Sequence, residues 1–280
     1  MALPSLTLLG QSLLSGLFIG ALYGLLGLGL SLSWGMLRQI NLAHFALAFL
    51  GAYLTYQLAG AGINPLATLA VIVPCFFALG ALMHWLLARF SVSALVTFGL
   101  TAIIEALIQW IWTADFRRME SGYSDVKFRV GALYVALPEL LTLAMALALS
   151  LAVWAWLRHT YTGKAMRAIA EDAPIAAAFG VDVHGLSLLL SGLCAAFAGV
   201  AGLSLALSYT LAPGQIYAWL GVVFAAVMLG GLGNPLGPLV AGIVIGVSEA
   251  LTMAFTAPAW APLVSFSLLI VVLLARPGRI

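Results

Sequence analysis

Long apolar stretches, separated by short polar breaks, run through the whole of this 280-residue chain. The stretches are continuous, and most reach the roughly 20 residues that an α-helix needs to cross a bilayer. A spanning β-barrel would alternate apolar and polar positions, so this pattern excludes one. The pattern predicts nine spans, at Leu6–Trp34, Ile40–Leu58, Pro65–Ala88, Ala94–Thr113, Leu137–Leu157, Leu186–Leu211, Ile216–Leu229, Leu239–Phe255 and Ala261–Ala275.

The composition leads to the same class. Hydrophobic residues make up 64% of the chain and charged residues 7%, against roughly 45–50% and 25% in soluble domains. We therefore expect an all-α polytopic membrane protein, one domain over residues 1–280, with about 8–10 transmembrane helices, some of them re-entrant or broken. Its surroundings are the lipid bilayer, and a net charge of +2 gives no indication of nucleic acid. Cys75 and Cys194 lie inside apolar runs and are expected to pack as small hydrophobes rather than bind a metal.

The basic residues set the orientation. Alternating sides through nine spans places seven of the eleven Lys and Arg residues on one face: Arg38, Arg89, Arg158, Lys164, Arg167, Arg276 and Arg279. The positive-inside rule makes that face cytoplasmic and leaves the N-terminus outside. The longest polar break, Ala114–Ala136, is then an extracytoplasmic loop. The span count would change if the Gly-rich turn at 230–238 were re-entrant.

The most polar segment between two spans is Arg158–Gly185, a predicted cytoplasmic loop over 158–185. Lys164, Arg167 and Glu171 are spaced i, i+3 and i+7, which places them on one face of a helix. Small apolar residues form its other side: Ala165, Ala168, Ile169 and Ala176. A polar helix kept between membrane spans favours docking to another protein. The alternative is an amphipathic loop that lies on the membrane surface.

A second, short helix is predicted at Pro174–Phe179. Pro174 disfavours helical backbone at the residue before it, so the first helix should end at Asp172, and Asp172 or Ala173 should cap the second. Gly180 suits the left-handed position that ends a helix. Ala177 and its neighbours, with Phe179, form a small apolar knob that fits a groove in a partner. The predicted docking set is Lys164, Arg167, Glu171, Asp172, Pro174, Ala177, Phe179 and Gly180.

Polar side chains inside spans are costly and are usually functional. Thr101 and Glu105 share one helical face with Gln109, and Glu249 lies deep in another span. Asn41 and His44 lie three apart, on one face of the second span. We expect these residues to line or gate a path for a small solute. The alternative for each is a hydrogen bond that fixes helix packing.

Two groups of glycines indicate close backbone contacts. Gly16, Gly20 and Gly24 are spaced by four and so leave one helical face without side chains, where a neighbouring helix can approach. Gly230, Gly231 and Gly233 belong to the Gly- and Pro-rich stretch before Leu239. That stretch is either a broken helix whose ends face a solute or a plain tight turn.

Three stretches resemble the permeases of branched-chain amino acid ABC transporters. They are GKAMRAIAEDAPIAAAFGVDV in the polar segment, GLGLSLSWGMLRQINLAHFALAFLGAYLTY at Gly27–Tyr56, and AAVMLGGLGNPLGPLVAGIVIGVSEAL at Ala225–Leu251. The similarity covers nearly the whole chain in order, and the Asn-x-Ala-His motif is typical of the shorter, H-type permeases. The resemblance implies an importer of branched-chain amino acids or similar small solutes in the bacterial inner membrane.

The resemblance also implies partners: a second, M-type permease subunit, two ATP-binding cassette subunits and an extracytoplasmic solute-binding protein. The sequence has no G-x-x-x-x-G-K-[ST] phosphate loop, since Lys164 is followed by Ala165 and lacks the upstream glycine. We therefore expect a transport subunit rather than an enzyme, with no catalytic residue, metal or cofactor of its own. ATP and Mg²⁺ would be held by the partner subunits.

Other membrane functions fit the sequence less well. A secondary transporter or channel would more often carry paired charges inside the membrane, whereas only two acidic residues and no Lys or Arg lie deep in the predicted spans. An intramembrane serine protease would need a G-x-S-G setting. The two LLSG stretches, at Leu13–Gly16 and Leu189–Gly192, lack its first glycine.

Overall fold

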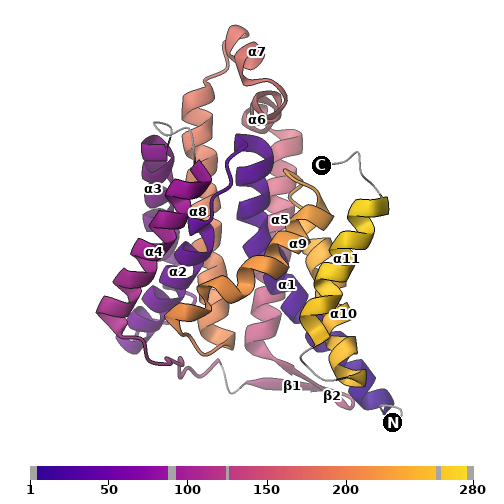
Figure 1. Ribbon diagram of the computed structural model, residues 1–280. Coiled ribbons are helices and arrows are strands. Elements are labelled where there is room, and N and C mark those ends of the chain that lie inside the picture. The colour runs from indigo at the N-terminus through magenta and orange to yellow at the C-terminus, as the bar shows by residue number, and fades with distance from the viewer. Residues whose placement is uncertain (1–4, 88–92, 124–125, 257–259, 276–280) are drawn as a thin grey trace.

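A computed structural model describes residues 5–87, 93–123, 126–256 and 260–275 as a bundle of long helices (Figure 1). Three of the charged residues used above, Arg89, Arg276 and Arg279, lie outside these ranges. The elements are α1 (Leu6–Leu37), α2 (Ala43–Gly60), α3 (Leu69–Leu87), α4 (Ser93–Trp112), β1 (Lys127–Val130), β2 (Leu133–Ala136), α5 (Leu137–His159), α6 (Tyr161–Glu171), α7 (Ala173–Ala178), α8 (Val183–Ser208), the 3₁₀ helix η1 (Pro213–Trp219), α9 (Leu220–Gly230), α10 (Gly237–Phe255) and α11 (Ala261–Ala275).

Among the described residues, seven helical segments are long and apolar enough to cross a membrane. They are α1, α3, α4, α5, α8, the continuous η1–α9 segment and α10. Figure 1 shows α2 and the 15-residue α11 running alongside them. An all-α polytopic membrane protein is therefore confirmed. Seven of the nine predicted spans correspond to these segments, and α2 and α11 lie at the positions of the other two.

Some boundaries differ from the prediction for local reasons. The third span begins at Leu69 rather than Pro65, because Asn64 Oδ1 accepts a hydrogen bond from the Leu66 amide (2.9 Å) and holds a turn there. The sixth begins at Val183 rather than Leu186, because the Asp182 side chain caps α8 by accepting from the Gly185 amide (3.0 Å). The predicted break at 212–215 is instead the start of η1.

The polar break 114–136 is not simply a loop, as the sequence suggested. Its second half is an antiparallel hairpin in which Lys127 pairs with Ala136 and Val130 with Leu133. Gln11 of α1 holds its edge: the Gln11 side chain donates to the Tyr134 carbonyl (2.9 Å) and accepts from the Tyr134 amide (3.0 Å). The hairpin therefore lies against the start of α1.

The centre of the bundle is α1 with α2, α8 and α10. In α1 and α8 most residues are buried inside the protein, whereas α3, α4 and α5 leave most of their apolar side chains at the surface. Apolar side chains that face outward suit a lipid environment. The α6–α7 segment projects at one end of the bundle, and the β1–β2 hairpin and the start of α1 lie at the opposite end (Figure 1).

The first group of glycines lies in the contact between α1 and α10. A Cβ added at Gly16 would lie 2.6 Å from the Val247 Cα, and one added at Gly24 would lie 2.6 Å from the Leu239 Cα. Distances this short leave no room for a side chain, so the two backbones pack directly on each other. Gly242 and Gly246 of α10 face α1 in the same way, so both helices carry small residues four apart where they cross.

Candidate functional site

The first candidate surface is α6. Thr160 caps it by accepting from the Gly163 amide (3.0 Å), and the predicted polar face, Lys164, Arg167 and Glu171, is exposed. The side turned to the bundle differs in part from the prediction: Ile169 is buried as expected, but Met166 is buried too and Ala168 is exposed. Because a methionine fills more space than an alanine, Met166 provides the main anchor of α6.

The second helix, α7, begins at Ala173. Asp172 is its N-cap, and its Oδ1 accepts from the Ile175 amide (2.9 Å), with Pro174 in the first turn. Gly180 follows the helix with a φ of +86°, a conformation that costs a side chain about 1–2 kcal/mol. Phe179 is 85% exposed and Ile175 57% exposed.

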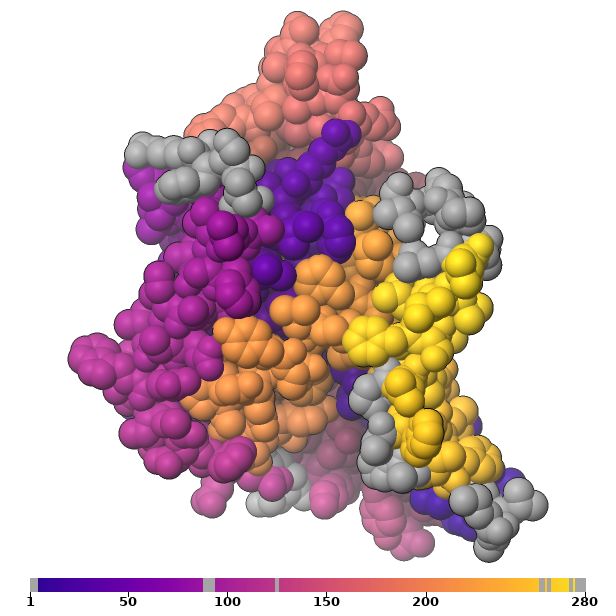
Figure 2. Space-filling view, viewed as in Figure 1, coloured from indigo at the N-terminus to yellow at the C-terminus, as the bar shows by residue number. Residues whose placement is uncertain are grey.

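Only the small residue Ala176 of this helix is buried, and the adjacent Ala177 is exposed. The α7 tip therefore presents a bare apolar side chain at the end of the molecule. Figure 2 shows this tip standing clear of the bundle.

Arg38 connects this projection to the central helix. Arg38 ends α1 in a left-handed conformation, with φ at +53°. Its Nη2 donates to the carbonyl oxygens of Ala170 and Glu171, each at 3.3 Å. These carbonyls lie at the C-terminal end of α6, where a cation also complements the helix dipole. Arg38 also lines a cavity of about 340 Å³ between α1, α3, α8 and the α6–α7 joint.

A second candidate surface lies along α4. Glu105 is partly exposed, and its carboxylate accepts from Gln109 Nε2 (3.3 Å) and from the Tyr217 hydroxyl of η1 (3.0 Å). Thr101 is buried instead and donates to the Thr97 carbonyl within its own helix (2.9 Å). Of the predicted face, Thr101 is therefore turned into the protein, and Glu105 is partly exposed at its surface.

Asn41 and His44 do not share a helical face, because α2 begins only at Ala43 and Asn41 precedes it. The linker is held by Thr97 of α4, whose hydroxyl accepts from the Leu42 amide (3.1 Å) and lies 3.3 Å from the Ile40 carbonyl. His44 is 1% exposed, and its Nε2 donates to the Leu26 carbonyl of α1 (2.9 Å). This contact favours the packing interpretation of His44.

Glu249 in α10 also lies inside the bundle. The Tyr23 hydroxyl donates to its Oε2 (2.8 Å), and the Ser265 hydroxyl donates to its Oε1. These contacts join α1, α10 and α11 through one carboxyl group. Because both oxygens have internal partners and the residue is buried, the arrangement favours packing for Glu249.

The second group of glycines forms the turn between α9 and α10. Gly231 and Gly233 have φ values of +88° and +75°, and Gly230 lies directly against Gly237, where α10 begins. The turn is fixed to α1, because the Gly233 amide donates to the Ser31 carbonyl (3.0 Å). Of the two interpretations left open, this geometry favours a tight turn.

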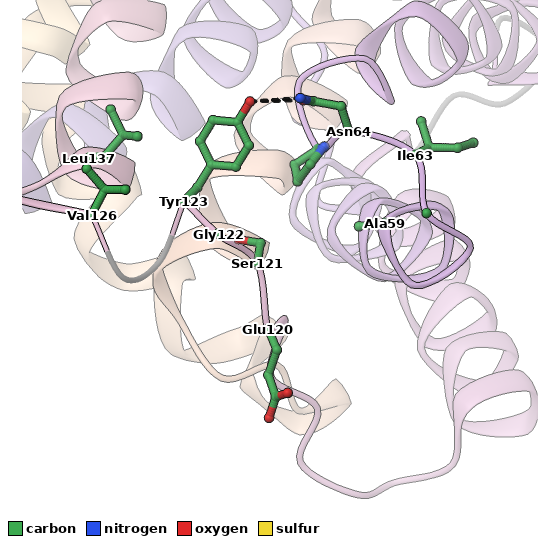
Figure 3. A pocket seen from close by; sticks show the side chains of 11 residues that line it. Ala59, Ile63, Asn64, Glu120, Ser121, Gly122, Tyr123, Val126 and Leu137 are labelled. Atoms are coloured by element: carbon green, nitrogen blue, oxygen red, sulfur yellow. Dashed lines mark hydrogen bonds between the residues drawn. The ribbon is translucent and has the colours of Figure 1, made fainter.

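A cavity of about 500 Å³ lies at the end opposite α7 (Figure 3). It is lined by residues of the α2–α3 connection and by Glu120, Ser121, Gly122, Tyr123 and Val126. Figure 3 shows Asn64 and Tyr123 pointing toward each other, with an Asn64 Nδ2 to Tyr123 hydroxyl distance of 2.9 Å, while Glu120 points away from this pair. The cavity provides a polar opening at the hairpin end of the bundle.

The sequence did not identify several residues on which these sites depend. Tyr217 and Tyr23 were read only as part of apolar runs, and they find their acidic partners 112 and 226 positions away in the chain. Gly242 and Gly246 did carry a signal, because their spacing by four matches the spacing of the glycines in α1.

Comparison with known proteins identifies the family. The sequence profile of the family described as "Branched-chain amino acid transport system / permease component" matches residues 12–273. The chain belongs to this family.

Among its relatives are two proteins named "High-affinity branched-chain amino acid transport system permease protein LivH", from Salmonella typhimurium and Escherichia coli. Each is 28% identical over 96% of this chain and 94% of the relative. The BraD permease of Pseudomonas aeruginosa is 24% identical with the same coverage. No solved structure gave a significant match.

The family is described as a permease component of a transport system, and its relatives are named as permeases. The chain is a multi-pass membrane protein, and it carries an exposed segment at one end and a polar cavity at the other. The resemblance inferred from the three sequence stretches is therefore confirmed.

Proposed function

We propose that the chain is the permease subunit of an ABC importer that moves branched-chain amino acids across the bacterial inner membrane. The observation that carries this proposal is the α7 tip, an exposed Phe179 held on a capped helix at one end of a family member. Phe179 and Ile175 together leave apolar surface in water at the tip of a polar segment, and a partner that covered this tip would remove that surface from water.

The partner at this end is an ATP-hydrolysing subunit. Phe179 and Ile175 supply the apolar centre of a small interface, while Lys164 and Arg167 of α6 supply a polar rim, as interfaces commonly require. Motion of the partner would reach the bundle through two contacts: the packing of Met166, and the bonds from Arg38 to the end of α6. The segment would then move as a rigid body.

The second permease subunit would cover the face formed by α4, η1 and α9. Figure 2 shows η1 and α9 at the surface between α4 and α11. Glu105 lies on this face within a membrane-spanning helix, and an ionised side chain there is costly against lipid. A solute path between two permeases, bordered by Glu105, would keep the acidic group out of the hydrocarbon.

The hairpin end would receive solute from an extracytoplasmic binding protein. Supporting this, the cavity beside Asn64 and Tyr123 opens at that end, and Gln11 fixes the neighbouring hairpin to α1. The binding protein would select the solute, while the permease chain would provide the route inward.

Co-purification tests the docking arrangement. The chain is expressed with the companion permease and ATPase subunits from the same organism, and Phe179→Ala is compared with Phe128→Ala. Phe128 lies in β1 at the opposite end and is also exposed. We expect Phe179→Ala alone to release the ATPase subunits. Equal retention of the ATPase by both variants would remove the assignment of α7 as the docking element.

Reconstitution tests the transport function. Proteoliposomes that contain the complete complex and the binding protein should accumulate leucine only with ATP, and vesicles that contain this chain alone should not. Accumulation of leucine without nucleotide would instead indicate a secondary transporter.

A further inference from the structure

We propose that the Glu105 carboxylate, flanked by Tyr217 and Phe98, binds the ammonium group of the amino acid as it crosses the membrane. This inference rests on the proposed function and names the group that recognises the solute on the α4–η1 face. Four features of that face support it: the depth of the carboxylate, its neutral partners, the irregular backbone beside it and the aromatic rings around it.

The depth of Glu105 places a charge where lipid cannot stabilise it. α4 runs from Ser93 to Trp112, and Glu105 lies twelve residues after its start, about 18 Å along the axis at ~1.5 Å per residue. The other end of α4 is about 10 Å away by the same measure. A carboxylate at this depth normally faces a bundle interior or a water-filled cavity, yet Glu105 is partly exposed at the surface of this chain.

The two donors to Glu105 are both neutral. Gln109 Nε2 donates to Oε1 and the Tyr217 hydroxyl donates to Oε2, so the two bonds orient the carboxylate without cancelling its charge. Neither α4 nor η1 contains a Lys or an Arg. A carboxylate has about four lone-pair positions, which leaves acceptor sites for a cation that carries several N–H donors. The ammonium group of an amino acid is such a cation.

The backbone that brings Tyr217 to Glu105 is irregular. The C-cap of α8, Tyr209, has an extended conformation, as does Ala212 before η1, and η1 itself is a 3₁₀ helix rather than an α-helix. Backbone of this kind is tolerated within a membrane where it is covered by protein or lines an aqueous cavity. η1 packs against α4 and carries Tyr217, so the irregular segment borders the carboxylate directly.

Aromatic rings next to the carboxylate suit an aliphatic side chain. The Phe98 and Tyr217 rings lie 6.5 Å apart between centroids, at a tilt of 47°, and they are 48% and 40% exposed. Phe98 and Glu105 are seven positions apart and so lie on the same face of α4. A solute held by its ammonium group at Glu105 would therefore place its apolar portion over these rings.

Glu249 provides a contrast within the same chain. It is 6% exposed, and both of its oxygens accept from internal hydroxyl groups. Of these two membrane carboxyl groups, only Glu105 therefore lies on a face that a solute can reach. Glu249 is accordingly a matched control for any substitution that removes a carboxylate charge.

The first test measures coupling in proteoliposomes that contain the complete importer and its binding protein. We compare Glu105→Gln, Glu105→Asp and Glu249→Gln by the amount of leucine accumulated per ATP hydrolysed. Glu105→Gln keeps the size and one acceptor oxygen but removes the charge, so it should still assemble and hydrolyse ATP. The amount of leucine accumulated per ATP hydrolysed should fall roughly tenfold or more, because the variant loses one charge-assisted hydrogen bond to the ammonium group, and a bond of that kind changes an affinity by about this factor. Glu105→Asp should recover part of the ratio, and Glu249→Gln should retain it.

The second test measures access and does not depend on turnover. Ala102→Cys, an exposed position one helical turn before Glu105, keeps the carboxylate; in a background with Cys75→Ala it is treated with a cationic, membrane-impermeant thiol reagent in the assembled complex. Labelling should be rapid and should slow in the presence of leucine. The wild-type chain serves as the comparator in a separate reaction. Its Cys75 is exposed on α3, whose apolar side chains face outward, and it should react slowly with or without leucine.

Three results would overturn the inference. One is a wild-type ratio of leucine to ATP in Glu105→Gln. Another is loss of the second permease subunit from this variant, which would show that a cation of the partner, rather than the solute, pairs with Glu105. The third is labelling of the introduced cysteine that leucine does not affect. Absence of ATP-driven leucine uptake in the wild-type complex would instead contradict the proposed function itself.

Discussion

Gly20 of α1 and Gly242 of α10 pack so closely that a Cβ on either would lie 2.5 Å from the backbone oxygen of the other. This reciprocal contact lies midway along the α1–α10 interface, the most extensive helix pair among the described residues. Lipid is as apolar as the helices, so close packing, rather than the hydrophobic effect, holds two such helices together. The α1–α10 pair therefore depends on the absence of side chains at these positions.

Gly20→Ala should destabilise the protein by about 1–3 kcal/mol, because the added methyl group meets backbone that cannot rotate away. The measurement is the Tm of the purified chain in detergent. Gly99→Ala is the matched control, since a Cβ at that position of α4 meets nothing within 4 Å. Equal Tm values for the two variants would contradict the importance of the α1–α10 contact.

Tyr23→Phe should lower the Tm as well. The substitution keeps the ring but removes the hydroxyl that donates to Glu249, and a buried acceptor that loses a partner costs about 1–3 kcal/mol. Tyr134→Phe removes a hydroxyl from an exposed tyrosine of β2 and should leave the Tm unchanged. A Tyr23→Phe variant as stable as wild type would show that Ser265 alone is sufficient for Glu249.

Asp172→Ala should weaken the attachment of the ATPase subunits by unfolding the first turn of α7. The loss of an N-cap costs about 1 kcal/mol, which is a large fraction of the stability of a six-residue helix. Asp172→Asn retains an oxygen that can accept from the Ile175 amide, and it should behave like wild type in co-purification. If both variants lose the ATPase equally, then the charge of Asp172 is what matters, and not the cap.

Arg38→Gln should separate ATP hydrolysis from transport. The substitution removes the guanidinium that contacts the end of α6 but leaves the exposed α7 surface intact. The complex should therefore assemble and hydrolyse ATP while leucine uptake falls. Arg158→Gln is the control at the same end, because Arg158 lies over the Trp154 ring instead. Normal uptake by Arg38→Gln would place the mechanical link elsewhere, with the buried Met166 as the next candidate.

The local features of the α6–α7 segment were predictable from the sequence. Pro174, Asp172 and Gly180 each act through backbone geometry within a few residues, and the structure has the break, the cap and the left-handed residue at those positions. The β1–β2 hairpin was not predicted, because its strands are only four residues each and lie among charged residues. Its position depends on Gln11, which is far away in the sequence.

For the intramembrane polar residues, too, the sequence predicted one property and missed another. Their presence in apolar runs was visible in the sequence, but their accessibility was not. Glu105 and Glu249 look alike in sequence, each a single acid within a span, yet one is partly exposed and the other is enclosed by Tyr23 and Ser265. Burial depends on which helices are neighbours, and a single sequence does not specify the neighbours.

The amino-acid sequence alone determined that this protein crosses a membrane many times and presents one capped polar segment, because hydrophobic length and helix capping are local properties of the chain. Only the tertiary structure decided that α1 packs on α10 through glycines from both helices, and that Tyr217 meets Glu105 across 112 positions. Such contacts arise from helix packing, which brings together residues that no local pattern relates.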